Sequence, residues 1–308
     1  MTLIARELPL APNPLGLARR LSARRECLFL WSADARGPSY LAPRPEHESS
    51  ELDPEPALAC APVNGTLARA PRWIGVLPYE ARRELERPAY RRSTEDRALP
   101  HLCQPRWFRL GAVACIDRRV TVIGDERASV DELCRDLLGD ERAAGEVTLS
   151  ALASEPVERH GERIRAALEL IRAGQIYQVN LARRLDFELR GHALDVLAAM
   201  SRRTRPAYAA LLELGDVSLV STSPELFLRQ LTNGSALTEP IKGTRPRGHD
   251  AASDAAHAAE LDGDPKERAE LSMIIDVERN DLGRVCELGS VRVAQSAHVR
   301  TQGLVWHR

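Results

Sequence analysis

The sequence predicts an α+β fold in which strands pair in antiparallel fashion and helices lie between the strand groups. Two tight turns carry this prediction, Gly215-Asp216 and Asn233-Gly234. Two-residue turns of this kind join antiparallel strands, whereas parallel strands need long crossover connections. The expected strands around them are residues 208–214 and 217–222 for the first turn, and 226–231 and 235–239 for the second. A long helix predicted over 265–280 follows these pairs, which favours α+β over a regular βαβ alternation.

The first half of the chain shows the same organisation less clearly. Apolar runs predict strands at 27–31, 39–41, 73–77, 110–116 and 120–123. The last two runs flank Asp117-Arg118-Arg119 and predict a hairpin. Helical patterns are expected over 79–86 and 130–138, and the Pro- and Glu-rich stretch 43–62 is expected to be a loop.

The second half begins with an amphipathic helix predicted over 157–173. Ile164, Leu168 and Ile171 fall on one helix face, and Gly174 is placed to end the helix. We expect a further helix over 193–201. Alternating side chains predict a strand over 176–187, and a final strand is expected over 290–293.

Composition excludes several classes of protein. The net charge of −1 provides no basic field, so nucleic acid is not an expected partner. No stretch approaches the roughly 18 apolar residues of a membrane span, and no signal peptide is apparent. The six cysteines are scattered without a CxxC motif, so we expect reduced, mostly buried thiols in a cytoplasmic protein. Of the 43 basic residues only two are lysines, Lys242 and Lys266, so these amines draw attention.

Two segments place polar side chains in apolar surroundings. Gln178 and Asn180 alternate along the strand predicted at 176–187, which indicates either a pocket wall or a sheet edge. Glu225 directly follows Pro224 between two predicted strands. Such a carboxyl group can be a general acid if burial favours its protonated form, or simply a solvated turn residue.

Two further segments combine loops with charge. Lys242, Gly243 and Thr244 lie in a loop rich in Pro and Gly, where the backbone can approach a ligand and the amine can be a nucleophile or a carboxylate partner. The alternative is a basic surface turn. Glu267 and Glu270 open the long helix; the helix dipole favours them there, and carboxylates on one face are also how Mg²⁺ is held.

Taken in order, these segments resemble the chorismate-utilising enzymes: anthranilate synthase component I, aminodeoxychorismate synthase component I, isochorismate synthase and salicylate synthase. The resemblance is strongest over 157–293. It is weaker at 73–80, where Trp73-Ile74-Gly75-Val76 with Tyr79-Glu80 resembles a glycine-rich family segment. It implies two large antiparallel sheets packed face to face with outer helices, an active site in the cleft between them, chorismate as substrate and Mg²⁺ as the ion that binds its carboxylate.

The resemblance also implies roles for individual residues. Glu225 matches the general acid that assists loss of the 4-hydroxyl, Glu270 matches a Mg²⁺ ligand, and Gly243-Thr244 match the loop that contacts chorismate. His307 matches the family's active-site histidine. Gln178 stands where the water-using members carry a lysine, which implies a member that uses ammonia.

Lys242 is the position that discriminates among ammonia-using members. Anthranilate synthases carry Ala in P-I-A-G-T, whereas aminodeoxychorismate synthases carry Lys, and this chain has P-I-K-G-T. The resemblance therefore implies aminodeoxychorismate synthase component I, which aminates chorismate at C4 on the 4-aminobenzoate pathway to folate. A separate glutamine amidotransferase subunit would supply the ammonia. The alternatives are anthranilate synthase component I and a non-catalytic remnant that serves as a binding or regulatory module.

The end of the chain adds an expectation about completeness. Family members continue past the segment at 304–308 into a glycine-rich loop and a second Glu-bearing helix. We expect an N-terminal region over 1–150 and a chorismate-binding region over 151–308 that lacks its C-terminal part. We also expect the 308-residue chain alone to fold poorly and not to aminate chorismate.

Overall fold

The computed structural model describes residues 3–51, 70–81, 102, 104–231, 233–294 and 297–308. The chain divides into two compact units. The first comprises 1–143 and 197–308, and the second comprises 144–196. The predicted division at 150/151 stays a prediction.

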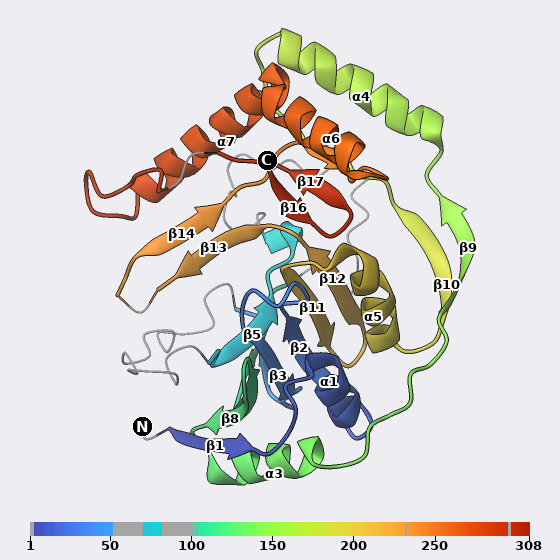
Figure 1. Ribbon diagram of the computed structural model, residues 1–308, viewed down its shortest axis with the longest axis vertical. Helices are drawn as coiled ribbons and strands as arrows, with labels where there is room; N and C mark the ends of the chain where they lie inside the picture. Colours follow the sequence, from blue (N-terminus) through green and yellow to red (C-terminus); the bar gives the residue numbers. More distant parts are fainter. Residues whose placement is uncertain (1–2, 52–69, 82–101, 103, 232, 295–296) are drawn as a thin grey trace. The chain divides into compact units, whose positions relative to one another are not determined.

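The largest element of the first unit is a seven-stranded antiparallel sheet (Figure 1). Its order is β1-β8-β7-β3-β2-β11-β12. The strands are β1 Ile4–Leu8, β2 Cys27–Trp31, β3 Ser39–Pro43, β7 Ala112–Ile116, β8 Val120–Gly124, β11 Tyr208–Glu213 and β12 Ser218–Ser223. The hairpins β7–β8 and β11–β12 are those that the sequence predicts around residues 117–119 and 215–216.

Two helices, α1 (Pro14–Ser22) and α3 (Arg127–Leu137), pack on one face of this sheet. The sequence starts α1 clearly: Asn13 accepts the Gly16 N–H and Pro14 occupies the first turn. Alternation along β2 directs Phe29 to one side of the sheet and Leu28 to the other. Both are fully buried, so the sheet carries an apolar layer on each face.

A small sheet contributes to the second apolar layer. It consists of β4 (Glu48–Ser49), β6 (Arg106–Arg109) and β5 (Trp73–Val76), in that order. Ile74 and Phe108 from these strands join Leu28 and Leu212 of the large sheet in one buried cluster. The strand predicted at 73–77 is therefore confirmed. The predicted loop 43–62 contains β4, and its residues 52–62 lie outside the described part.

The rest of the first unit contains short strands and the helices α6 and α7, which join at Asp264. We call this junction, residues 260–267, the elbow. The hairpin β13–β14 joins Leu226–Gln230 to Ala236–Glu239, and a three-stranded sheet has the order β15-β17-β16. Its strands are Thr244–Pro246, Val305–His307 and Arg300–Gln302 respectively. Helix α6 (Ala251–Gly263) ends at Asp264, which caps α7 (Pro265–Gly283) by accepting the N–H groups of Lys266 and Glu267.

The second unit contains a two-stranded sheet and a helix. Strands β9 (Thr148–Ser154) and β10 (Leu185–Arg190) pair in antiparallel fashion, and α4 (Val157–Arg172) lies between them in the sequence. Helix α5 (Ala193–Thr204) begins in this unit. The helix predicted at 157–173 is confirmed, and Gly174 has a φ of 69° as its capping role requires. Its apolar stripe is nevertheless exposed.

The α+β class and the predicted hairpins are confirmed. The strands beyond the seven-stranded sheet form two- and three-stranded sheets in the described residues, whereas the resemblance implied a second large sheet. The other predicted helices, at 130–138, 193–201 and 265–280, are confirmed as α3, α5 and α7. The helix expected at 79–86 is a 3₁₀ turn over Tyr79–Ala81, and residues 82–86 lie outside the described part.

The strand predicted over 290–293 is wrong, and the strand predicted over 176–187 is confirmed only at 185–187. Residues 176–184 are irregular and β10 begins only at Leu185, so Gln178 and Asn180 do not share a strand face. Residues 290–293 form a turn and an irregular stretch. In both places alternating side chains suggest a strand, but a strand forms only where a partner backbone accepts its hydrogen bonds.

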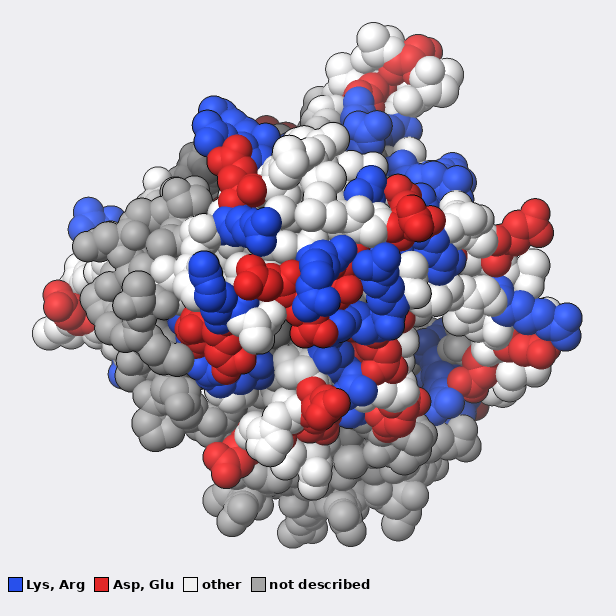
Figure 2. Space-filling model, turned by 90° about the horizontal axis from the view of Figure 1, so that it is seen from below, with Lys and Arg blue, Asp and Glu red and all other residues white. Residues whose placement is uncertain are grey.

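The side of the molecule seen in Figure 2 carries interleaved basic and acidic side chains rather than a field of one sign. Opposite charges also pair between neighbouring elements. Arg25, in the turn after α1, pairs with both Glu132 and Asp136 on α3. Within the described part of the chain, no helix is long and apolar enough to cross a membrane.

Candidate active site

Lys242 lies in the short segment that links β14 to β15. Glu225, which directly precedes β13, fixes this segment. Its Oε1 atom accepts a hydrogen bond from the Ile241 N–H at 2.7 Å. The Ser223 hydroxyl accepts the Glu225 N–H at 3.3 Å, so the corner after β12 is itself hydrogen-bonded. Glu225 is exposed. The structure thus brings Glu225 and Lys242 into one site, as the sequence predicts.

The backbone of Lys242 is held from a second direction. Its N–H donates to the Arg308 carbonyl at 2.9 Å, and the Arg308 N–H donates to the Lys242 carbonyl at 3.1 Å. The Lys242 side chain is half-buried. Among the described residues, its amine makes no hydrogen bond or ion pair, so the backbone is fixed while the amine retains its hydrogen-bonding capacity.

Gly243 and Thr244 bring the loop against its neighbours. Gly243 has a φ of 70°, and a Cβ there would lie 2.7 Å from Leu261 Cδ1 and 3.1 Å from Glu267 Oε2. Only glycine combines this conformation with such a close approach. Thr244 pairs with His307 across β15 and β17, and their Oγ1 and Nδ1 atoms are 3.2 Å apart.

His307 is half-buried, and its pKa lies below the usual value mainly because burial penalises the charged imidazolium ring. Its Nδ1 also lies 3.3 Å from the Gly243 carbonyl oxygen. Arg300 lowers the pKa further, whereas Glu225 and the hydrogen bond to Gly243 oppose the shift. The structure therefore places His307 beside the Lys242 loop, and its predicted catalytic role stays a prediction.

Asp254 on α6 supports the strand that carries His307. Its carboxylate accepts hydrogen bonds from Arg247 Nε at 2.7 Å, Gly248 N at 2.8 Å and Trp306 Nε1 at 2.9 Å. Arg247 also lies over the Trp306 ring, 4.8 Å from its centroid. These donors hold the pKa of Asp254 well below its usual range, with the Arg247 hydrogen bond as the largest cause.

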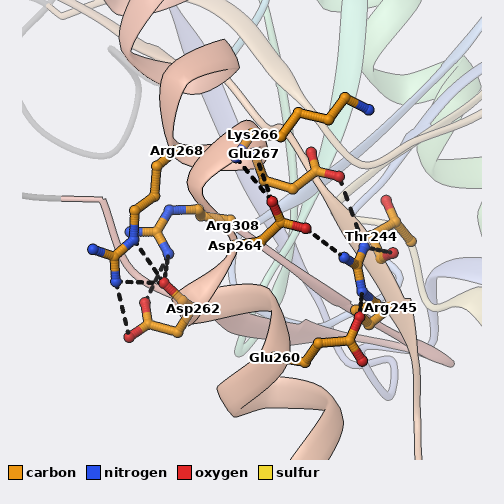
Figure 3. A network of polar contacts seen from close by, with 9 residues as sticks. All are labelled: Thr244, Arg245, Glu260, Asp262, Asp264, Lys266, Glu267, Arg268 and Arg308. Carbon is orange, nitrogen blue, oxygen red and sulfur yellow. Dashed lines mark hydrogen bonds and ion pairs between the residues drawn. The ribbon is translucent and has the colours of Figure 1, made fainter.

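A second polar network connects the same strands to the elbow between α6 and α7 (Figure 3). Arg245 donates to Glu260 at 2.7 Å and to the capping residue Asp264 at 2.8 Å, and it lies 3.7 Å from Glu267. Asp262 accepts hydrogen bonds from Arg308 through its carbonyl at 2.9 Å and its carboxylate at 2.7 Å. The loop 242–244 is thus fixed on both sides by arginines bound to this elbow.

Glu270, the predicted Mg²⁺ ligand, lies half-buried on α7, one turn beyond Glu267. Glu267 is already paired with Arg245. Within the described residues there is no group of three His, Cys, Asp or Glu side chains that could hold a metal ion. Mg²⁺ is usually held by one or two protein carboxylates together with water and substrate, and Glu270 offers one such carboxylate.

Glu278 is a site residue to which the sequence analysis gave no role. It lies on α7, and its Oε2 accepts the Thr238 hydroxyl at 3.1 Å. Burial raises its pKa, the nearby Glu225 adds to the rise, and Lys242 opposes it. Only the helical position of Glu278 could be predicted from sequence, because Thr238, which binds it, lies forty residues earlier in the chain.

Gln178 belongs to the second unit and lies in the irregular stretch before β10. Its predicted substrate-binding role stays a prediction. In the first unit, an open pocket of about 150 Å³ lies beside the Glu225 corner. It is lined by Thr204, Pro206, Thr222, Pro224, Gln302, Leu304 and Val305.

Comparison with known proteins decides the family. Residues 30–308 match the family described as chorismate binding enzyme. The chain belongs to this family.

Curated relatives in the family carry two different names. The chain is 43% identical over 167 residues to anthranilate synthase component 1 of Thermus thermophilus, covering 54% of this chain and 36% of the relative. It is 42% identical over 138 residues to aminodeoxychorismate synthase component 1 of Klebsiella aerogenes, covering 45% of this chain and 30% of that relative. The matched part of the chain thus spans about a third of each relative's length.

Solved structures confirm the fold. The menaquinone-specific isochorismate synthase MenF from Escherichia coli has a TM-score of 0.61 at 14% identity, over 99% of this chain and 68% of that one. Anthranilate synthase component I from Streptococcus pneumoniae has a TM-score of 0.59 at 21% identity, over 76% of this chain and 56% of that one.

Proposed function

We propose that this chain carries the active-site segment of an aminodeoxychorismate synthase component I, which aminates chorismate at C4. The observation that carries the proposal is Lys242, held by its backbone beside Glu225 and His307 with its amine available. The relatives of similar identity that are named aminodeoxychorismate synthase component 1 support it.

In the proposed reaction the Lys242 amine attacks chorismate C2 while the bond between C4 and the hydroxyl oxygen breaks. Glu225 is exposed in this structure, so bound substrate must bury it before it donates a proton to the departing oxygen, which leaves as water. Ammonia then attacks C4, the C2–nitrogen bond breaks, and the lysine amine is regenerated. The amine must be uncharged at the moment of attack, which a closed and poorly solvated site favours. Arginine could not replace it, because a guanidinium group stays protonated.

The other site residues have supporting roles in this proposal. Gly243 and Thr244 let the backbone approach the substrate. His307, largely uncharged at neutral pH, orients Thr244 and the chorismate ring. Gln178 takes the place of a water-activating lysine. Mg²⁺ would be held by Glu270 together with water and substrate, and its charge would bind the carboxylate of chorismate.

Ammonia is proposed to come from a glutamine amidotransferase subunit. The relatives are named component 1, which implies a second component in those proteins. Amination at C4 would place the product on the route to 4-aminobenzoate and folate.

Anthranilate synthase component I is the second candidate function. It is favoured by relatives of that name, which match this chain at 40% and 43% identity over longer stretches than the aminodeoxychorismate synthases do. A reaction of that type would not need Lys242 as a nucleophile.

The nature of the aminated product separates the two candidates. In a chain extended by the C-terminal part that family members carry, chorismate, ammonia and Mg²⁺ are expected to give 4-amino-4-deoxychorismate, and Lys242→Ala is expected to abolish this product. Anthranilate that forms equally with Lys242→Ala would contradict the proposal and support the second candidate.

A further inference from the structure

The three-stranded sheet of β15, β17 and β16 carries a row of polar side chains across its strands. Thr244 on β15 lies opposite His307 on β17, and His307 lies opposite Arg300 on β16. Side chains at directly opposite positions of antiparallel strands share one face of the sheet. The contact of 3.2 Å between Thr244 Oγ1 and His307 Nδ1 agrees with this rule. Arg300 therefore lies on the sheet face that carries Thr244 and His307.

This face of the sheet is directed away from α6 and towards the corner after β12. On the opposite face, Trp306 donates a hydrogen bond to Asp254 of α6. Gln302 shares the face of Arg300, because it is two residues further along β16, and it donates to the Pro224 carbonyl at 3.3 Å. Gln302 and Pro224 both line the open pocket of about 150 Å³. The row thus borders a space that a small ligand can enter.

The guanidinium group of Arg300 has hydrogen-bond donors to spare. Within the described residues, its contact with a charged group is one ion pair with Glu239 on β14. The distance of 3.7 Å between Arg300 Nη2 and Glu239 Oε2 is too long for a hydrogen bond. The Arg300 side chain is 30% exposed, so a ligand can reach it. Glu239 therefore attracts the guanidinium group without using its donors.

We propose that Arg300 binds a carboxylate group of the substrate on this face, beside His307 and Thr244. A guanidinium group presents two parallel N–H donors that match the two oxygens of a carboxylate. The inference rests on the proposed function, which takes chorismate as the substrate. Chorismate has two carboxylates, and Mg²⁺ held by Glu270 would bind one of them. Arg300 binds the other and so fixes the substrate at two points.

Calorimetric titration in the presence of Mg²⁺ tests the inference, with a chain extended by the C-terminal part that family members carry. The probes are chorismate and its two monomethyl esters, each of which lacks one carboxylate charge. Every chain carries Lys242→Ala, so reaction at the lysine does not enter the measured affinity. Arg300→Gln should weaken the binding of chorismate and of one ester about 10- to 100-fold, as expected for the loss of a hydrogen-bonded charge pair. The other ester lacks the charge that Arg300 binds, so its affinity should change by less than about twofold.

Two further variants complete the test. Arg300→Lys keeps the charge but lacks the paired donors, so it should bind chorismate with intermediate affinity. The matched control is Arg279→Gln, which removes an exposed arginine that pairs with Asp276 on α7 and should leave all three affinities unchanged.

Three results would overturn the inference: equal weakening of all three ligands in both Arg300 variants, no change in either variant, or a chain with Arg300 that binds chorismate no better than both esters. If the expected pattern is found but chorismate forms no adduct with Lys242 in the chain that retains this lysine, the result counts against the proposed function alone.

Discussion

In the first unit, the region of the seven-stranded sheet and the region around α6 and α7 are held together by different interactions. Helices α3 and α7 show the difference. Helix α3 has 11 residues and buries Val130, Leu133, Cys134 and Leu137 against the seven-stranded sheet. Helix α7 has 19 residues, all within the described part, and buries Leu271 alone. Ion pairs and hydrogen bonds hold the region around α7 instead, through Arg245, Arg247 and Arg308. The large sheet depends on apolar burial, whereas the candidate site depends on charge.

The largest effect expected from this comparison is the loss of a core aromatic. Phe29 is fully buried in β2, so Phe29→Ala should lower the free energy of unfolding by about 3–5 kcal/mol. Phe227 is 87% exposed on β13, and Phe227→Ala should change it by less than about 0.5 kcal/mol. Urea unfolding monitored by circular dichroism measures both. Equal losses would show that the two regions do not differ as described.

A smaller effect is expected at the loop that carries the candidate nucleophile. Gly243→Ala introduces a Cβ 2.7 Å from Leu261 in a left-handed conformation, which should cost about 1–2 kcal/mol and displace Lys242. Gly263→Ala, where nothing lies within 4 Å of the new atom, is the control and should stay within about 0.5 kcal/mol. The same unfolding measurement applies. A wild-type stability of Gly243→Ala would contradict the close packing of this loop.

The region around α7, which ion pairs and hydrogen bonds hold together, should become less stable in acid. The pKa of Asp254 is lowered in the folded chain, so its ionised form stabilises the fold above the unfolded pKa, near 4. This contribution is lost as the pH falls towards the lower folded value. Asp254→Asn should therefore lower the melting temperature at pH 7 and reduce its further decrease between about pH 4 and pH 2. If the melting temperature fell equally with pH in the wild-type chain and in Asp254→Asn, the prediction would be contradicted.

The smallest effect concerns thiol chemistry. Burial is the main reason why the pKa of Cys27 lies well above its usual range, and Glu213 adds to the rise. Cys115 and Cys134 are also buried, whereas Cys286 follows α7 and is partly exposed. A thiol-alkylating reagent applied to the folded chain at neutral pH should modify Cys286 and spare these three. Rapid labelling of Cys27, seen by peptide mass spectrometry, would show that the sheet opens readily.

The same contrast explains what the sequence could predict. The hairpins and α3 follow from local signals, tight turns and apolar periodicity, and these were confirmed. Segment 176–184 has the alternation of a strand, but its side chains do not determine whether a partner strand is available. The exposed face of α4 shows the same limit, because a stripe of Ile and Leu predicts a helix but not what covers it.

The candidate site was predictable where motifs carry it and not where distant elements meet. Glu225, Lys242 and His307 were predicted from short segments, and the structure brings them together. Glu278 gained its significance only from the contact with Thr238, forty residues earlier in the chain. The support of β17 by Asp254 likewise depends on a register that no local pattern specifies.

The most direct test of the account is whether chorismate forms a covalent adduct with the chain. The first half-reaction needs neither ammonia nor a partner subunit, so the test uses chorismate, Mg²⁺ and the chain extended by the C-terminal part that family members carry. Mass spectrometry of the intact chain and of its peptides should show a gain of one chorismate less one water on Lys242, absent in Lys242→Ala and Lys242→Arg. Bound chorismate without such an adduct, or an adduct on Lys266 instead, would contradict the central claim that Lys242 is the nucleophile.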